Sequence, residues 1–288
     1  MNDQRVVNAK VVGNKSNIWN KILLAIVLVC VGAAGMYGVM KINPSMTVVN
    51  KLEKEVTVNE NGIADAVEKV YDSVVVVENY RSNKLQATGT GFIFKKDNNK
   101  YYVMTNYHVI ESSSKVKVVF TDDSNTEVEV VGGDKYADIA VLSFTSSKDM
   151  TVAEIGSSTD GRVGDTTFAV GAPLDSSTYS WTVTRGILSG KDRMVAVSTT
   201  NSTSSDYIMR VLQTDAAINN GNSGGPLCNS NGQVIGVTNM KLVSSGVEGM
   251  GFAIPIEDAI SFANKIINGE DITRPRLGIS MVELSVAE

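Results

Sequence analysis

Short runs of apolar, largely β-branched residues, separated by Gly, Asn, Asp and Ser, fill the chain after about residue 72. Runs of about four to eight such residues between turn-forming residues are typical of β-strands. No helical segment separates consecutive runs, which argues against a parallel sheet. We predict twelve strands: Val74–Glu78, Gly91–Phe94, Tyr101–Met104, Lys115–Phe120, Glu127–Val131, Ile139–Phe144, Thr166–Val170, Trp181–Leu188, Ile208–Thr214, Pro226–Cys228, Val234–Lys241 and Gly251–Ile254.

A loop-rich stretch at about residues 145–165 divides these strands into two sets of six. Antiparallel sheets of this size commonly close into barrels, which leaves no free edges. We therefore predict an all-β fold made of two six-stranded antiparallel barrels packed together. Apolar residues at helical spacing add a short helix over Ile63–Val70 before the barrels and an amphipathic helix over Ile256–Ile267 after them.

The N-terminal part follows another pattern, because residues 22–40 form an uncharged apolar stretch of 19 residues. As a helix this stretch would span roughly 28 Å, close to the thickness of a bilayer core. Four basic residues against one acid precede it, which predicts a single-pass transmembrane helix with a cytoplasmic N-terminus and an extracytoplasmic C-terminal bulk. A cleaved signal peptide, with Ala33-Ala34-Gly35 near the cleavage site, is the alternative, and a buried helix is a third.

The composition argues against several classes of function. The net charge of −5 gives no basic surface for nucleic acid. Cys30 lies in the apolar stretch and is not expected to pair with Cys228, so no disulfide framework is predicted. His108 is the only histidine, which argues against a multi-histidine metal site. We predict neither a metal nor another cofactor.

Glycines flank a serine in Gly221-Asn222-Ser223-Gly224-Gly225-Pro226-Leu227. Glycine allows a turn tight enough to aim backbone N–H groups at a developing oxyanion. We predict Ser223 as a nucleophile and Gly221, Asn222 and Ser223 as the oxyanion hole. The segment alone is also typical of an ordinary hairpin turn.

A serine hydroxyl needs a base, and the one histidine, His108, follows a predicted strand in a short turn. A lone histidine is commonly structural, but beside a candidate nucleophile we predict it to be the general base. Asp138 stands directly before an apolar strand, where a buried carboxylate could orient the imidazole. Asp134 is a nearby competitor in what looks like a more solvent-exposed context.

The order His108, Asp138, Ser223 is that of chymotrypsin-like enzymes and differs from that of α/β-hydrolases. The motifs Thr105-Asn106-Tyr107-His108-Val109, Ala137-Asp138-Ile139-Ala140-Val141-Leu142 and the glycine-rich serine segment resemble the HtrA/Deg family of trypsin-like serine proteases. The resemblance covers residues from about 63 to 278.

That resemblance implies an ATP-independent endopeptidase for misfolded or damaged cell-envelope proteins, often a homotrimer and sometimes chaperone-like. Together with the N-terminal pattern, the resemblance predicts five segments: a cytoplasmic tail at 1–21, a transmembrane anchor at 22–40, a stalk at 41–62, a trypsin-like serine protease domain at 63–268, and a linker with the vestigial start of a PDZ-like region at 269–288. The chain ends ten residues after Gly278, too soon for a PDZ domain to be built.

In chymotrypsin-like folds the residue six before the nucleophile lies at the base of the S1 pocket, and here it is Ala217. Without a carboxylate there, binding of Lys or Arg is disfavoured because their charge would lack a partner. With Ile218, Val237 and Thr238 as neighbours, we predict cleavage after Val, Ala or Ile. The alternative function is a proteolytically silent chaperone or scaffold of the same fold, and an α/β-hydrolase esterase is disfavoured because β-like residues follow the serine.

Overall fold

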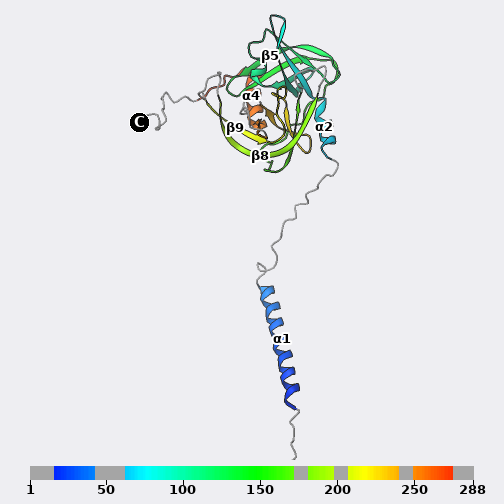
Figure 1. The fold of residues 1–288 in the computed structure, drawn as a ribbon, viewed down its shortest axis with the longest axis vertical. Helices are drawn as coiled ribbons and strands as arrows, with labels where there is room; N and C mark the ends of the chain where they lie inside the picture. Colours follow the sequence, from blue (N-terminus) through cyan, green and yellow to red (C-terminus); the bar gives the residue numbers. More distant parts are fainter. Residues whose placement is uncertain (1–15, 43–61, 172–180, 198–206, 240–248, 275–288) are drawn as a thin grey trace, which may run out of the picture. The chain divides into compact units, whose positions relative to one another are not determined.

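A computed structural model describes residues 16–42, 62–171, 181–197, 207–239 and 249–274. The chain divides into two compact units, Met1–Asn59 and Glu60–Glu288, and each is described by itself (Figure 1).

The described part of the first unit is one helix, α1 (Ser16–Ile42). It contains the apolar stretch 22–40, and the large apolar side chains described in that stretch are exposed, with Leu23 at 67% and Val29 at 71%. Among the described residues, no helix combines the length and the apolarity needed to cross a membrane. The predicted transmembrane span is therefore not confirmed. Most of the predicted tail and stalk lies outside the described residues.

The second unit contains two closed six-stranded antiparallel barrels, as predicted. In the first barrel the hydrogen-bonded order is β1-β2-β3-β6-β5-β4. Its strands are β1 (Val74–Arg81), β2 (Lys84–Asp97), β3 (Lys100–Thr105), β4 (Lys115–Val119), β5 (Asn125–Asp134) and β6 (Ile139–Thr145).

The second barrel has the order β10-β11-β12-β9-β8-β7 and also closes on itself. The stretch between the barrels adds one short bridge, Ile155 to Val234 of β11. The strands are β7 (Thr166–Gly171), β8 (Thr182–Val197), β9 (Tyr207–Thr214), β10 (Pro226–Asn229), β11 (Val234–Thr238) and β12 (Gly251–Pro255).

Two of the three helices in the described part of this unit were predicted. They are α2 (Ala64–Tyr71) and α4 (Ile256–Asn268). Helix α4 ends where Gly269 takes a left-handed conformation with φ 68°, a conformation that glycine adopts without steric cost. The third helix, α3 (Tyr107–Ile110), is a single turn that the sequence pattern did not indicate.

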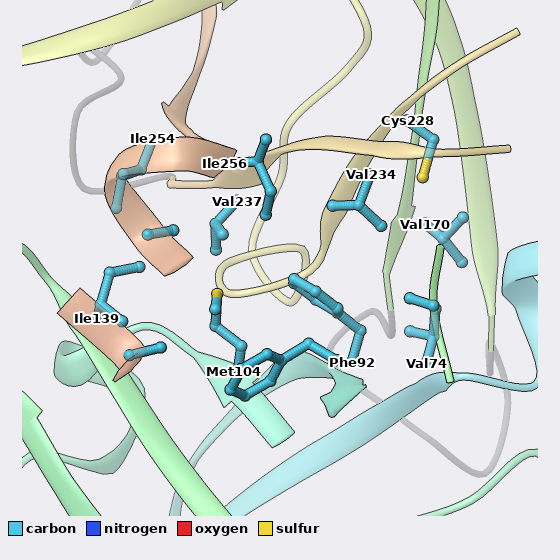
Figure 2. Close-up of a cluster of buried hydrophobic side chains, with 14 of the residues drawn as sticks. Val74, Phe92, Met104, Ile139, Val170, Cys228, Val234, Val237, Ile254 and Ile256 are labelled. Atoms are coloured by element: carbon cyan, nitrogen blue, oxygen red, sulfur yellow. The ribbon is translucent and has the colours of Figure 1, made fainter. Parts of the chain in front are cut away.

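The main hydrophobic core lies where the two barrels meet. Figure 2 shows side chains from both barrels converging there, all of them buried. Burying one such side chain contributes about 1.5–3 kcal/mol, so the shared core fixes one barrel against the other. Loops at the junction can therefore form one site. The core residues include Phe92, Met104 and Ile139 of the first barrel and Val170, Val237 and Ile254 of the second.

Candidate active site

His108 lies on the single turn of α3, at the end of β3. This turn is too short to be stable alone. Asn79 of β1 stabilises it, because its side-chain Nδ2 donates to the carbonyl of Val109 at 2.9 Å and to that of Glu111 at 3.1 Å. The His108 side chain is about one-quarter exposed (26%). The turn is therefore fixed by Asn79, while the imidazole stays accessible to a substrate.

Asp138 contacts residue 108 at two points. Its Oδ2 lies 2.7 Å from His108 Nδ1, and its Oδ1 accepts the His108 backbone N–H at 2.9 Å. The Asp138 side chain is 3% exposed. The backbone carbonyl of Asp138 accepts a hydrogen bond from Asn106 Nδ2 at 2.9 Å. A carboxylate can only accept, so His108 Nδ1 is the donor, which leaves Nε2 available as a base.

A third residue reaches this carboxylate from the other barrel. Asn239 follows β11, is completely buried, and donates its Nδ2 to Asp138 Oδ2 at 2.8 Å. Its backbone N–H donates to the Phe252 carbonyl of β12 at 3.0 Å. No pattern in the sequence marks Asn239, since an asparagine after a strand is an ordinary turn residue.

Ser223 belongs to the loop before β10 and is 7% exposed. The loop is tied to the first barrel by Thr90 of β2, whose N–H donates to the Ser223 carbonyl at 2.9 Å. The Thr90 hydroxyl also donates to the Gly221 carbonyl at 2.5 Å. Gly221 has φ 105°, a conformation that a residue with a Cβ rarely adopts.

The serine loop and the histidine turn pack against the same point of β2. A Cβ added to Gly89 would lie 2.7 Å from a methyl group of Val109 and 3.1 Å from the Ser223 carbonyl oxygen. A Cβ added to Gly224 would lie 2.8 Å from the Asn106 backbone nitrogen. The structure thus brings Ser223 next to the turn that carries His108.

Among the residues predicted for the oxyanion hole, Asn222 has an N–H group that is used inside the loop. The Asn222 N–H donates to the Asn219 carbonyl at 3.0 Å. The Asn222 carbonyl in turn accepts from Gly225 N–H at 2.9 Å and from the Thr238 hydroxyl at 2.5 Å. Asn222 therefore acts as the internal brace of the loop.

The residues predicted for the substrate pocket differ in how far they are exposed. Ala217 is exposed, and its carbonyl accepts from the Thr184 hydroxyl at 2.9 Å and from Asn222 Nδ2 at 3.2 Å. Ile218 is 7% exposed and lies beside Gly251, where a Cβ would be 2.6 Å from its Cγ1.

The other two predicted pocket residues, Val237 and Thr238, are completely buried. Figure 2 shows Val237 in the core between the barrels. The Thr238 hydroxyl bonds to the carbonyls of Asn222 and Gly225. Neither side chain is exposed to a substrate.

Two further groups of the described domain are the carboxylate of Asp134 and the thiol of Cys228. Asp134, the competitor of Asp138, is paired with Arg274 and only 11% exposed, so its expected solvent-like context is wrong. Burial raises the pKa of the Cys228 thiol, which is completely buried in β10. A thiol in that state is protonated and unreactive.

A family model described as a trypsin-like peptidase domain matches residues 89–237. That span includes His108, Asp138 and Ser223. The fold and the site therefore define the class as the trypsin-like serine peptidases.

Curated relatives narrow the class. Serine protease Do-like HtrB of Bacillus subtilis is 40% identical over 79% of this chain and 52% of the relative. Serine protease Do-like HtrA of Lactococcus lactis subsp. cremoris is 36% identical over 94% of this chain and 74% of the relative. The chain belongs to the HtrA family of trypsin-like serine proteases, which confirms the resemblance seen in the motifs.

Solved structures of serine proteases resemble this chain in fold. The serine endoprotease from Yersinia pestis has a TM-score of 0.60 at 32% identity, covering 72% of this chain and 66% of that one. The HtrA-type protease AlgW with a tripeptide has a TM-score of 0.60 at 30% identity, covering 72% and 64%. The chain spans about half the length of the Bacillus subtilis relatives HtrB and HtrA, at 52% and 43%.

Proposed function

We propose that this chain is an ATP-independent serine endopeptidase in which Ser223 is the nucleophile, His108 the general base and Asp138 the residue that orients the base. The observation that carries the proposal is the two-point contact of Asp138 with His108, at 2.7 Å to Nδ1 and 2.9 Å to the backbone nitrogen. This contact fixes the ring so that Nε2 can take a proton, which is what a serine hydroxyl requires.

The reaction needs only groups of this chain and water. Ser223 Oγ attacks the scissile carbonyl while His108 Nε2 takes the hydroxyl proton. The tetrahedral intermediate collapses as His108 returns the proton to the leaving amine, which gives an acyl-enzyme. Water, deprotonated by His108, then attacks the ester, and the carboxylic acid product leaves with Ser223 restored.

The oxyanion of both tetrahedral intermediates would be bound by the N–H groups of Gly221 and Ser223. Asn222 was predicted as a third donor, but its N–H already donates to Asn219 at 3.0 Å. We therefore assign it to bracing the loop. Removing one donor from such a hole typically costs about 100- to 1,000-fold in kcat.

For substrates we propose misfolded or damaged proteins, cleaved after small aliphatic residues. The exposed Ala217 offers no charge to a basic P1 side chain, and a buried unpaired charge is costly. The proposal predicts that peptides with Val or Ala at P1 are cleaved faster than matched peptides with Lys or Glu. Trimeric assembly is proposed from the family likeness alone and is tested by analytical ultracentrifugation.

We further propose that the protease unit works outside the cytoplasm, held at the cell membrane by α1. The support is the exposed apolar surface of that helix, including Leu23 and Val29, together with the excess of basic residues in the preceding tail. Digestion of intact cells with an external protease tests it. Protection of the domain equal to that of a cytoplasmic marker would contradict it.

Replacement of Ser223 by Ala tests the catalytic proposal. We expect cleavage of an unfolded protein such as reduced casein, and labelling by a fluorophosphonate, to disappear without loss of fold. Asp138→Asn should lower kcat by about 10,000-fold, the size of effect known for such a change. If the unaltered chain neither cleaves nor labels but suppresses aggregation, the chaperone alternative holds instead.

A further inference from the structure

Arg274 is held tightly although it lies 140 residues from its partner in the sequence. Its Nη1 donates to Asp134 Oδ2 at 2.7 Å, and its Nη2 donates to the other carboxylate oxygen. The guanidinium also lies 5.1 Å from the ring centre of Tyr136 and 5.6 Å from that of Phe262 in α4. A bidentate pair with two aromatic contacts fixes both the position and the plane of a guanidinium.

The carboxylate that Arg274 binds also closes the turn leading to Asp138. Asp134 Oδ1 accepts the backbone N–H of Ala137 at 2.6 Å. Asp134 ends β5 and Asp138 immediately precedes β6, so this bond spans almost the whole connection. With Arg274 in place, the Asp134 carboxylate has little freedom to turn away from the Ala137 N–H.

Asp138 itself has an unusual backbone conformation, with φ 52°. Non-glycine residues rarely occupy this left-handed region, and they stay in it only where their surroundings hold them. The neighbouring bonds do this from two sides. Asn106 and Tyr107 donate to the Asp138 carbonyl at 2.9 and 3.2 Å, while the Asp134 bond fixes the preceding residue.

We propose that Arg274 is a positioning residue for catalysis: through Asp134 it holds the turn of residues 134–138 so that the Asp138 carboxylate stays on His108. The inference rests on the proposed peptidase function. Without the guanidinium, Asp134 would rotate into solvent, Ala137 N–H would lose its acceptor, and Asp138 would relax toward an ordinary backbone conformation. Misplacing a catalytic group by about 1 Å can cost about 100-fold in rate.

The first test replaces Arg274 with Ala in the full chain. We expect kcat to fall about 10- to 100-fold with KM nearly unchanged, since Arg274 is not placed at the substrate site. Arg274→Lys keeps the charge but not the bidentate pair, so its kcat should lie between that of Arg274→Ala and that of the unaltered chain. An unchanged kcat in Arg274→Ala would overturn the inference.

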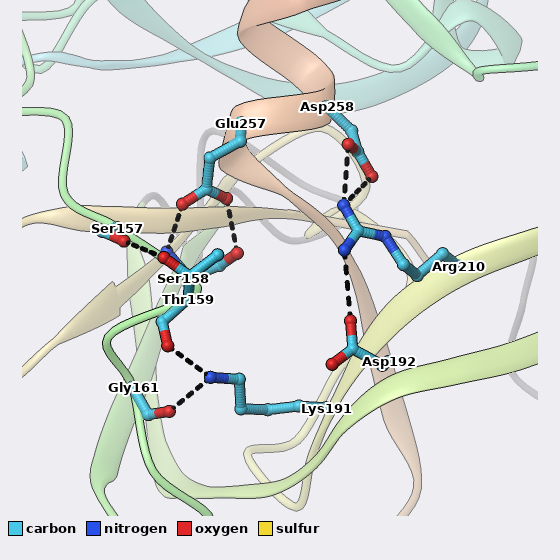
Figure 3. Close-up of polar contacts among 9 residues, drawn as sticks. All are labelled: Ser157, Ser158, Thr159, Gly161, Lys191, Asp192, Arg210, Glu257 and Asp258. Carbon is cyan, nitrogen blue, oxygen red and sulfur yellow. Dashed lines mark hydrogen bonds and ion pairs between the residues drawn. The ribbon is translucent and has the colours of Figure 1, made fainter.

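Arg210→Ala is the matched control. Arg210 is likewise held by carboxylates: its Nη2 donates to both oxygens of Asp258 in α4, at 2.8 and 2.9 Å, and its Nη1 donates to Asp192 at 3.1 Å (Figure 3). None of these partners belongs to the turn of residues 134–138. Arg210→Ala should lower the melting temperature about as much as Arg274→Ala while leaving kcat near that of the unaltered chain. Equal kcat losses in both variants would mean that the effect is general destabilisation.

A double-mutant cycle separates positioning from a merely structural role. If Arg274 acts through Asp138, then adding Arg274→Ala to Asp138→Asn should not slow fluorophosphonate labelling of Ser223 further. A full additional loss in that background would overturn the inference. Failure of the unaltered chain to label at all would instead remove the proposed function, so the two failures are distinguishable.

Discussion

At the residue scale, the acid of the site is shared between the barrels. Asp138 Oδ2 accepts from His108 Nδ1, which belongs to the first barrel, and from Asn239 Nδ2, which belongs to the second. A hydrogen bond to a buried charged group contributes about 1.5–3 kcal/mol. Asn239 thus keeps the carboxylate aligned with the imidazole and supplies a donor that water cannot reach.

Replacing Asn239 with Asp should therefore impair catalysis. The change swaps the donor for a second carboxylate at nearly constant shape, and like charges at this distance repel. We expect kcat to fall at least about 10-fold, the equivalent of losing a hydrogen bond worth about 1.4 kcal/mol, in a peptide assay at pH 7.

Asn229→Asp is the control, since it makes the same chemical change at the end of β10. Asn229 pairs there with Gln233 at 3.0 Å. The control should keep its turnover. Full turnover by Asn239→Asp would show that Asp138 needs no support from the second barrel.

Site residues that stand in a short sequence motif could be predicted, whereas residues whose role depends on contacts distant in the sequence could not. His108, Asp138 and Ser223 each stand in a short motif. Asn239 and Arg274 act across 101 and 140 residues of sequence, and no local pattern marks them. Val237 was predicted as a pocket neighbour of Ala217, but the face of a strand decides burial, and this face packs into the core.

At the element scale, the strands were predictable in number and order but not in length. The prediction of Gly91–Phe94 became β2 (Lys84–Asp97), and Trp181–Leu188 became β8 (Thr182–Val197). Both strands continue through polar residues whose pairing depends on the neighbouring strand. Helix α3 was missed because one turn has no periodicity, and its stability comes from Asn79.

Helix α4 is joined to the stretch between the barrels by Glu257. Its carboxylate accepts the Ser158 N–H at 2.8 Å and the Ser158 hydroxyl at 2.5 Å (Figure 3). Burial by itself raises the pKa of Glu257, but the hydrogen bonds from Ser158 and the backbone outweigh it and hold the pKa below its usual value. The charged form is thus the one that the fold stabilises.

We therefore expect Glu257→Gln to lower the melting temperature at pH 7, with a loss of about 1 kcal/mol or less because Glu257 is exposed. A depressed pKa gives stability that is present above the ordinary pKa and disappears as the pH falls through the folded value. The difference between variant and parent should shrink in thermal unfolding measured below about pH 4. Glu270→Gln, just beyond the same helix, is the control. A difference that grows toward low pH would contradict the assignment.

At the scale of the whole molecule, the second unit has its own core. The buried hydrophobic residues of the described chain begin at Ala66 and come from both barrels and the helices α2, α3 and α4. None of them belongs to α1. Folding of the barrels should therefore need no contact from the first unit.

Residues 60–288 expressed alone should unfold cooperatively at the melting temperature of the full chain. They should also cleave reduced casein at a similar rate per molecule. Calorimetry and a casein assay check both outcomes. A protein that unfolds without a cooperative transition would show that the core of the barrels depends on residues 1–59.

The pairing of His108 with Asp138 has a spectroscopic consequence. Because the chain has a single histidine, growth on ¹⁵N-labelled histidine places the isotope in one imidazole only. The Nδ1 proton engaged by the carboxylate at 2.7 Å then gives an unambiguous magnetic resonance signal without any assignment work. Its intensity measures the fraction of molecules in which Asp138 is hydrogen-bonded to His108 before any substrate is added.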